Sequence, residues 1–482
     1  MVSSGILLKL RVSRAPGTEE GEGRHPADND DSLALTSRVT YNRNMKEISM
    51  SKFDDHIEYF TTRMLALHRS SPLYFTFSTI FHNIAKDQLD TFHNKHIKNK
   101  RSIKHGIIKE FYDLKSAYDD TGATMVIMPE SFFVSLVSIY DFLISSCVRE
   151  ICVLKPDLLK SSEKSINFPQ ILKYNSLEDL QKYCLEETTE SVMRQSHTEH
   201  IEWLEDKSNT RLRPNEETWQ KFVECTQRRH LYVHTGGLVS EPYLRNCRAH
   251  KVKLPKDCTV GTRLSADAIY CESSFSTLFT MGALITHVLW RKYAPEESEA
   301  ADKSLNQLAF SLIDYAQYDL AITLLEFALN DIKKYSSEQT RLMFVVNLAQ
   351  SYKWSGNDAK CAELLQNLDP TGLPVEYKSA YFTLSEEYEA AITHIRSALK
   401  ISSINRHDIE QWPIYKQLRT TKEFADFYEK RYRTTWSPPD DDSDKTPFER
   451  LMPKLKAQRD NSEQSKKPRS KKRTTKKKPS RK

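Results

Sequence analysis

Glycine and proline are scarce in this chain, and their scarcity limits what it can fold into. The 482 residues include 12 Gly and 19 Pro, whereas average usage is about 7% and about 5%. Turn-rich β-sandwiches, TIM barrels and glycine-loop nucleotide folds need more of both residues. The sequence therefore predicts an all-α protein, and its length leaves room for two or three domains.

The formal charge of +6 comes from one end of the chain. Residues 466–482 contain eleven Lys or Arg and no acid, and the other residues, 60 basic and 65 acidic, have a net charge of −5. Such a tail is typical of an arm that binds nucleic-acid phosphates without reading the sequence. It contains no aromatic residue, so it offers no stacking surface for bases.

The cysteines and the hydrophobic runs indicate a cytoplasmic protein. Eight cysteines are scattered from Cys147 to Cys361, which fits free thiols in a reducing compartment better than a disulfide framework. The most apolar stretch, residues 132–148, contains Asp141 and several Ser and Tyr. We therefore expect no membrane span.

Composition divides the chain into four parts. Residues 1–50 are predicted to be a disordered leader, because residues 17–32 are polar and almost without apolar side chains. Residues 51–295 have the spacing of a helical bundle, and residues 296–435 that of short helix pairs. Residues 436–482 are predicted to be a linker and a disordered basic tail.

Six segments of this part have a helical pattern, and four or five main helices are expected to make the bundle. The predicted segments are two helices between residues 53 and 114, a helix from Pro129 to Leu154, a charged helical stretch over 177–207, a helix from Asn215 to the Gly236-Gly237 pair, and a last helix over 268–291 after a loop of about 25 residues.

Small residues recur through the helix pairs. Ala321, Cys361 and Ala391 occupy equivalent positions, 40 and 30 residues apart. This spacing resembles a degenerate tetratricopeptide array of about three units, closed by a helix near residues 412–432. A generic antiparallel helical domain is the alternative.

One segment, Gln227 to Gly237, has the residues for chemistry. On a helix of 100° per residue, Arg229 lies about 20° from Phe222, on the stripe formed by Trp219, Phe222, Val223, Thr226 and Val233. Arg228 lies away from this stripe and is expected to be solvated. His234 is in the last turn, so an arginine and a histidine meet at one helix end, where they suit an anion such as a phosphate.

The same residues resemble the motif of the HEPN superfamily, in which an arginine, a polar residue, three further residues and a histidine follow one another. Here these are Arg229, His230 and His234. The turn and short segment over 236–244 are also similar to HEPN proteins of bacterial defence and toxin type. The resemblance covers about 75 residues, from Asn215 to Arg291, and the bundle is larger than a compact HEPN domain.

The resemblance implies a metal-independent endoribonuclease without a cofactor. The ribose 2′-hydroxyl would attack its own phosphate and leave a 2′,3′-cyclic end. His234 would move the proton, Arg229 would hold the phosphorane, and His230 would orient the pair or contact the phosphate. The alternatives are RNA binding without cleavage and a helical adaptor that binds protein through its repeats and nucleic acid through its tail.

Other histidines and cysteines give weaker signals. The residue after His230 is Leu231, so the zinc-protease pattern is absent, and Cys247, His250 and Cys258 lack a fourth ligand at regular spacing. No metal site is expected. His197 and His200 lie in an acidic stretch and are expected to be solvated.

A homodimer is the expected assembly, because 2′-hydroxyl attack needs both a base and an acid. Two copies of His234 across a twofold axis would supply them, as the resemblance also implies. The helix over 133–154 is apolar on more than one face, and we expect Val137 and Ile144 at the contact.

Overall fold

The computed structural model describes residues 51–98, 105–160 and 171–437. The predicted leader and nearly all of the predicted linker and tail lie outside these ranges. The described residues form helices and no strand, apart from one isolated bridge between Leu238 and Arg263. The chain is all-α, as predicted. It falls into two compact units, one ending at Ile414 and the other beginning at Tyr415.

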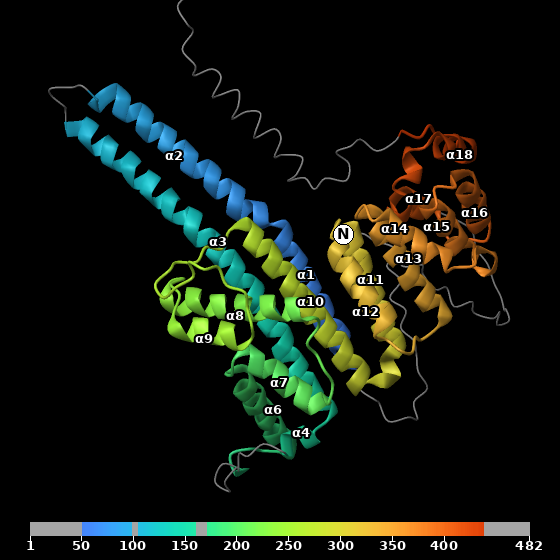
Figure 1. The fold of residues 1–482 in the computed structure, drawn as a ribbon, viewed down its shortest axis with the longest axis horizontal. Coiled ribbons are helices and arrows are strands. Elements are labelled where there is room, and N and C mark those ends of the chain that lie inside the picture. The colour runs from blue at the N-terminus through green and yellow to red at the C-terminus, as the bar shows by residue number, and fades with distance from the viewer. Residues whose placement is uncertain (1–50, 99–104, 161–170, 438–482) are drawn as a thin grey trace, which may run out of the picture. The chain divides into compact units, whose positions relative to one another are not determined.

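The first unit begins with the helices of the bundle (Figure 1). These are α1 (Phe53–Arg69), α2 (Ser78–Phe92), α3 (His105–Leu154), the short α4 (Asp157–Lys160), α6 (Leu177–Met193), α7 (His197–Ser208), α8 (Glu216–Thr235), α9 (Glu241–Ala249) and α10 (Ala268–Tyr293).

The core of the bundle forms where α1, α3 and α10 pack together. A Cβ on Gly282 of α10 would lie 2.7 Å from Phe60 of α1 and 2.9 Å from Leu143 of α3. Only glycine allows the three helices to approach this closely at that point. Helix α10 confirms the predicted last helix of the bundle, and its middle is closely packed in the core.

Helix α3 differs from the prediction, because it begins at His105 and continues through Pro129 without a break. A proline removes one backbone donor and strains the preceding turn, but packing can hold the helix together. Helix α2 runs beside the first half of α3 (Figure 1), and the rings of Tyr74 and Phe75 pack on Phe132, three residues after Pro129. Of the described helices, α3 is the one long and apolar enough to cross a membrane, and half of its most apolar window is buried in the protein.

Helix α3 also corrects the expected dimer contact. Val137 and Ile144 are fully buried inside the single chain. The apolar residues on more than one face of α3 are explained by packing on α1, α8 and α10. A charged residue at 137 or 144 would therefore disrupt the core rather than separate two subunits.

Helix α8 has the ends that the sequence predicts. The Asn215 side chain accepts a hydrogen bond from the Thr218 amide at 2.9 Å, which caps the first turn. Gly236 ends the helix in the left-handed conformation, with φ of 61°. The predicted 25-residue loop after it is wrong, because α9 lies within it. Ser240 caps α9, and Pro242 lies in its first turn.

Three helix hairpins follow the bundle in the same unit. They are α11 (Ser298–Asp314) with α12 (Tyr318–Asn330), α13 (Glu338–Trp354) with α14 (Asp358–Gln366), and α15 (Val375–Leu384) with α16 (Tyr388–Lys400). The predicted small residues Ala321, Cys361 and Ala391 are all buried between the helices.

Each hairpin turns through a residue with positive φ: Ala316, Gly356 and Glu386. These residues have the same 40- and 30-residue spacing as the small residues, and the amide after each bonds back across the turn. The pairs and their register are as expected, while a tetratricopeptide array stays a prediction. The expected boundary at residue 295 lies within the first unit, where α10 contacts α11 and α12.

The second unit contains α18 (Lys422–Tyr432), which lies within residues 412–432, where a closing helix is expected. Helix α17 (Arg406–Gln411) belongs to the first unit. Within the second unit, Phe424 and Tyr428 pack against Trp436, whose indole donates to the Arg419 carbonyl at 2.9 Å. These contacts give α18 a small aromatic core of its own.

Candidate functional site

A cleft of about 610 Å³ lies beside α8, and the three candidate residues line it together. Arg229, His230 and His234 reach it from the last two turns of α8. The opposite side is formed by the start of α7, with His197 and His200, by Asp141 of α3 and by the first turns of α9. The cleft is thus rich in imidazole and guanidinium groups, which suits an anionic ligand.

Arg229 is the half-buried cation of the cleft. Its Nε is buried without a hydrogen-bond partner, and it forms no ion pair within the described ranges. A buried donor without a partner costs free energy. Such a cost is typical of a group that is held ready for a ligand.

His230 and His234 are both exposed to the cleft, with ring centroids 4.4 Å apart. Partial burial lowers the pKa of His230, and the charges of His234, Arg229 and His197 lower it further. His230 therefore favours its neutral form at neutral pH.

His197 and His200 are not solvated, contrary to expectation. The His197 side chain is 14% exposed, and its Nε2 lies 2.8 Å from Oδ1 of Asp141. His200 is 3% exposed, and burial lowers its pKa. The acidic neighbours in the sequence suggested a solvated face, but α7 is amphipathic and places both histidines inward. The Ser196 and Glu199 capping box was the signal that a helix begins at His197.

Arg228 is also not solvated. Its Nε lies 2.7 Å from Oε1 of Glu224, and its guanidinium lies over the Tyr270 ring at 3.7 Å. Glu224 also accepts hydrogen bonds from the hydroxyls of Tyr243 and Tyr270, at 2.8 and 2.7 Å. Burial and the charge of Glu224 raise the pKa of both phenols, so they stay protonated and donate.

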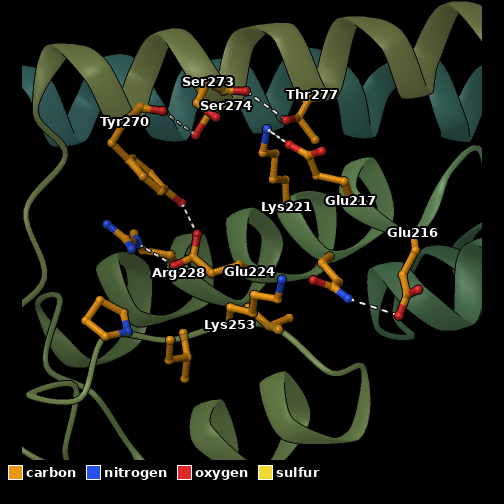
Figure 2. A pocket seen from close by; sticks show the side chains of 14 residues that line it. Glu216, Glu217, Lys221, Glu224, Arg228, Lys253, Tyr270, Ser273, Ser274 and Thr277 are labelled. Atoms are coloured by element: carbon orange, nitrogen blue, oxygen red, sulfur yellow. Dashed lines mark hydrogen bonds and ion pairs between the residues drawn. The ribbon is translucent and has the colours of Figure 1, made fainter.

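Arg228, Glu224 and Tyr270 line a second cleft, of about 680 Å³, on another side of α8 (Figure 2). Figure 2 shows Arg228 and Tyr270 converging on Glu224, with Lys221 paired to Glu217 further along the helix. Because successive helical residues differ by 100°, Arg228 and Arg229 enter different clefts. Arg228 is held by a carboxylate, and Arg229 is not.

The predicted buried stripe of α8 is correct in its first half and wrong at its end. Trp219, Phe222, Val223 and Thr226 are buried, but Val233 is 47% exposed. Leu231 is fully buried instead, in a cluster with Val239, Tyr243, Leu244 and Cys247. Helix α9 covers this face of the last turn of α8, so the error follows from reading α9 as a loop.

Within the described ranges, no group of three or more His, Cys, Asp or Glu is arranged to hold a metal ion. Comparison of the chain with protein-family models, curated proteins and solved structures gave no match. The chemistry of the cleft is therefore the basis for a functional assignment.

Proposed function

We propose that this protein is a metal-independent endoribonuclease of HEPN type, acting in a defence or toxin-like setting. The observation that carries the proposal is the gathering of Arg229, His230 and His234 in one cleft, with Arg229 unpaired in the described part of the chain. An unpaired guanidinium beside imidazoles matches a phosphodiester in charge and hydrogen bonding.

The reaction follows from the roles of these groups. His234 removes the proton of a ribose 2′-hydroxyl, whose oxygen then attacks the adjacent phosphorus. Arg229 donates to the non-bridging oxygens as the charge of the phosphorane develops. His230 contacts the phosphate or orients His234, and its lowered pKa keeps it neutral beside the other cations.

Incubation of the full chain with mixed tRNA and rRNA in EDTA tests the proposal. The expected result is discrete cleavage that leaves 2′,3′-cyclic phosphate and 5′-hydroxyl ends. Protein that binds these RNAs and never cuts them would contradict the proposal.

The second candidate is a non-catalytic adaptor that binds a protein through its helix hairpins and nucleic acid through its tail. An Arg229 locked to an internal carboxylate would favour the adaptor. Within the described ranges Arg229 forms no ion pair, whereas its neighbour Arg228 pairs with Glu224. The endoribonuclease is therefore the better reading of the cleft.

We expect the protein to act on RNA in the cytoplasm and to form a homodimer. Light scattering is then expected to give about twice the 56.0 kDa chain mass. A protein partner at the helix hairpins is compatible with either function.

A further inference from the structure

The proposed reaction needs two proton carriers, one for the 2′-hydroxyl and one for the leaving 5′-oxygen. His234 can serve only one of these purposes in a single step. The geometry points to His197, oriented by Asp141, as the general acid, so that one chain holds both carriers in the same cleft and the second His234 of the expected homodimer is not the acid. This inference rests on the proposed function and names a further catalytic residue for it.

The contacts of His197 fix the position and the orientation of its ring. Its Nε2 is bonded to Asp141 Oδ1 at 2.8 Å, and its side chain is 14% exposed. The ring packs against Phe222, with centroids 6.5 Å apart, and against His200, at 5.3 Å. A carboxylate on one ring nitrogen fixes the orientation of the ring, and within the described ranges Nδ1 of His197 makes no hydrogen bond.

The backbone at His197 is fixed as well. His197 is the first residue of α7, and the Ser196 hydroxyl accepts from the Glu199 amide while Glu199 accepts from the Ser196 amide. This reciprocal cap sets where the helix begins and therefore where the imidazole lies. Asp141 comes from α3, the central helix of the bundle, so both members of the pair stand on rigid elements.

His230 is a weaker candidate for the acid. It is exposed, it has no carboxylate partner in the described ranges, and the cations around it oppose its protonation. His200 is also unsuited, because it is buried and its pKa is lowered. Of the histidines lining the cleft, His197 is the one whose ring is bonded to a carboxylate within the described ranges.

The step balances within the cleft. His234 takes the 2′-hydroxyl proton, the 2′-oxygen forms a bond to phosphorus, and the bond from phosphorus to the 5′-oxygen breaks. His197 gives its proton to that 5′-oxygen. The products are a 2′,3′-cyclic phosphate and a 5′-hydroxyl, and exchange with water restores both imidazoles.

The test uses a leaving group that needs no acid. An oligoribonucleotide carrying the linkage that wild-type protein cuts is made with its bridging 5′-oxygen or with sulfur in that position. A thiolate leaves without protonation, so the sulfur substrate removes the need for the general acid. We expect His197→Gln to lose roughly 10²- to 10⁴-fold in rate on the oxygen substrate and to recover on the sulfur substrate. His234→Ala is expected to stay inactive on both.

Two further variants complete the test. Asp141→Asn keeps the side-chain shape, so it is expected to show a smaller loss with the same recovery on sulfur, and it serves if His197→Gln does not fold. His250→Gln is the matched control, because His250 packs on Trp219 outside the cleft. Normal cleavage of the oxygen substrate by folded His197→Gln overturns the inference and leaves the proposed function intact, as does loss without recovery on sulfur. If wild-type protein cuts neither substrate, both the inference and the proposed function are contradicted.

Discussion

Arg228 and Arg229 are adjacent in the sequence but have different surroundings. Arg228 lies in a network with Glu224, Tyr243 and Tyr270, whereas the Nε of Arg229 has no partner. Arg228 is therefore a structural residue, and Arg229 is free for a ligand. A pattern of apolar positions cannot distinguish the two, because it does not show where Glu224 and Tyr270 lie.

Alanine at each position is expected to separate these roles. Arg228→Ala leaves Glu224 without its cation in a largely buried site, so the free energy of unfolding is expected to fall by about 3 kcal/mol. Arg229→Ala removes a donor that has no partner, so stability is expected to change by less than about 0.5 kcal/mol. Urea unfolding followed by circular dichroism measures both. Equal destabilisation by the two variants would contradict the assignment.

His287 is expected to make the protein less stable in mild acid. It is fully buried on α10, and burial and then the charge of Arg291 lower its pKa well below 6.5. The unfolded chain binds a proton near pH 6.5 that the folded chain excludes. Stability is therefore complete above this pH and is lost as the pH falls from 6.5 toward the folded-state pKa.

Replacing His287 with Leu removes this dependence. Between pH 5 and 6.5, the slope of the unfolding free energy against pH is expected to decrease by up to about 1.4 kcal/mol per pH unit, which corresponds to the uptake of one proton. Urea midpoints measured at several pH values test this. If the variant keeps the wild-type slope, the acid sensitivity comes from other groups.

At the scale of the helices, local sequence patterns predict some helix ends, and tertiary packing determines the others. The ends of α8 follow from Asn215 and Gly236, and the hairpins follow from the small residues. The continuation of α3 through Pro129 could not be predicted, because local spacing does not show that Tyr74 and Phe75 pack on Phe132, three residues further on. Helix α9 had a start signal in Ser240 and Pro242, and missing it also misplaced the exposed Val233.

The candidate site could also be predicted from the sequence only in part. Arg229, His230 and His234 share one helix end, so their spacing brings them together. His197 and Asp141 lie 56 residues apart on different helices. Their meeting depends on how α3, α7 and α8 pack, which no local spacing reveals.

Alanine in place of two glycines in long helices is expected to change the free energy of unfolding in opposite directions. At Gly282 a Cβ would lie 2.7 Å from Phe60 and 2.9 Å from Leu143, so Gly282→Ala is expected to cost about 1 to 2 kcal/mol. At Gly122 of α3 the nearest atom would be His82 at 3.4 Å. Gly122→Ala is therefore expected to gain up to about 1 kcal/mol from helix propensity. Urea unfolding measures both, and stabilisation by Gly282→Ala would contradict the close packing of α1, α3 and α10.

At the scale of the whole molecule, the proposed function assigns RNA binding to two parts of the chain. The cleft offers Arg229 and the histidines beside it, and residues 466–482 offer eleven Lys or Arg. Charges of the second kind add affinity without sequence preference. The cleft would then select the phosphate that reacts, and the tail would keep RNA near it.

Deletion of residues 466–482 tests this division. RNA affinity is expected to drop. The slope of log affinity against log salt is expected to flatten by several units, at about 0.7 for each single-strand phosphate contact that is lost. Cleavage at saturating RNA is expected to survive. A control in which the same Lys and Arg are replaced by Gln keeps the tail length. An unchanged salt slope in both variants would show that the tail does not bind RNA.

The most direct test of the account is the cleavage rate in EDTA of wild type, Arg229→Ala and His234→Ala, on an RNA that wild type cuts, with folding checked by circular dichroism. The account predicts 2′,3′-cyclic phosphate ends for wild type and a loss of at least about 10²-fold for each variant, with helical content unchanged. Cleavage by either folded variant at the wild-type rate would contradict the claim that this cleft is the active site.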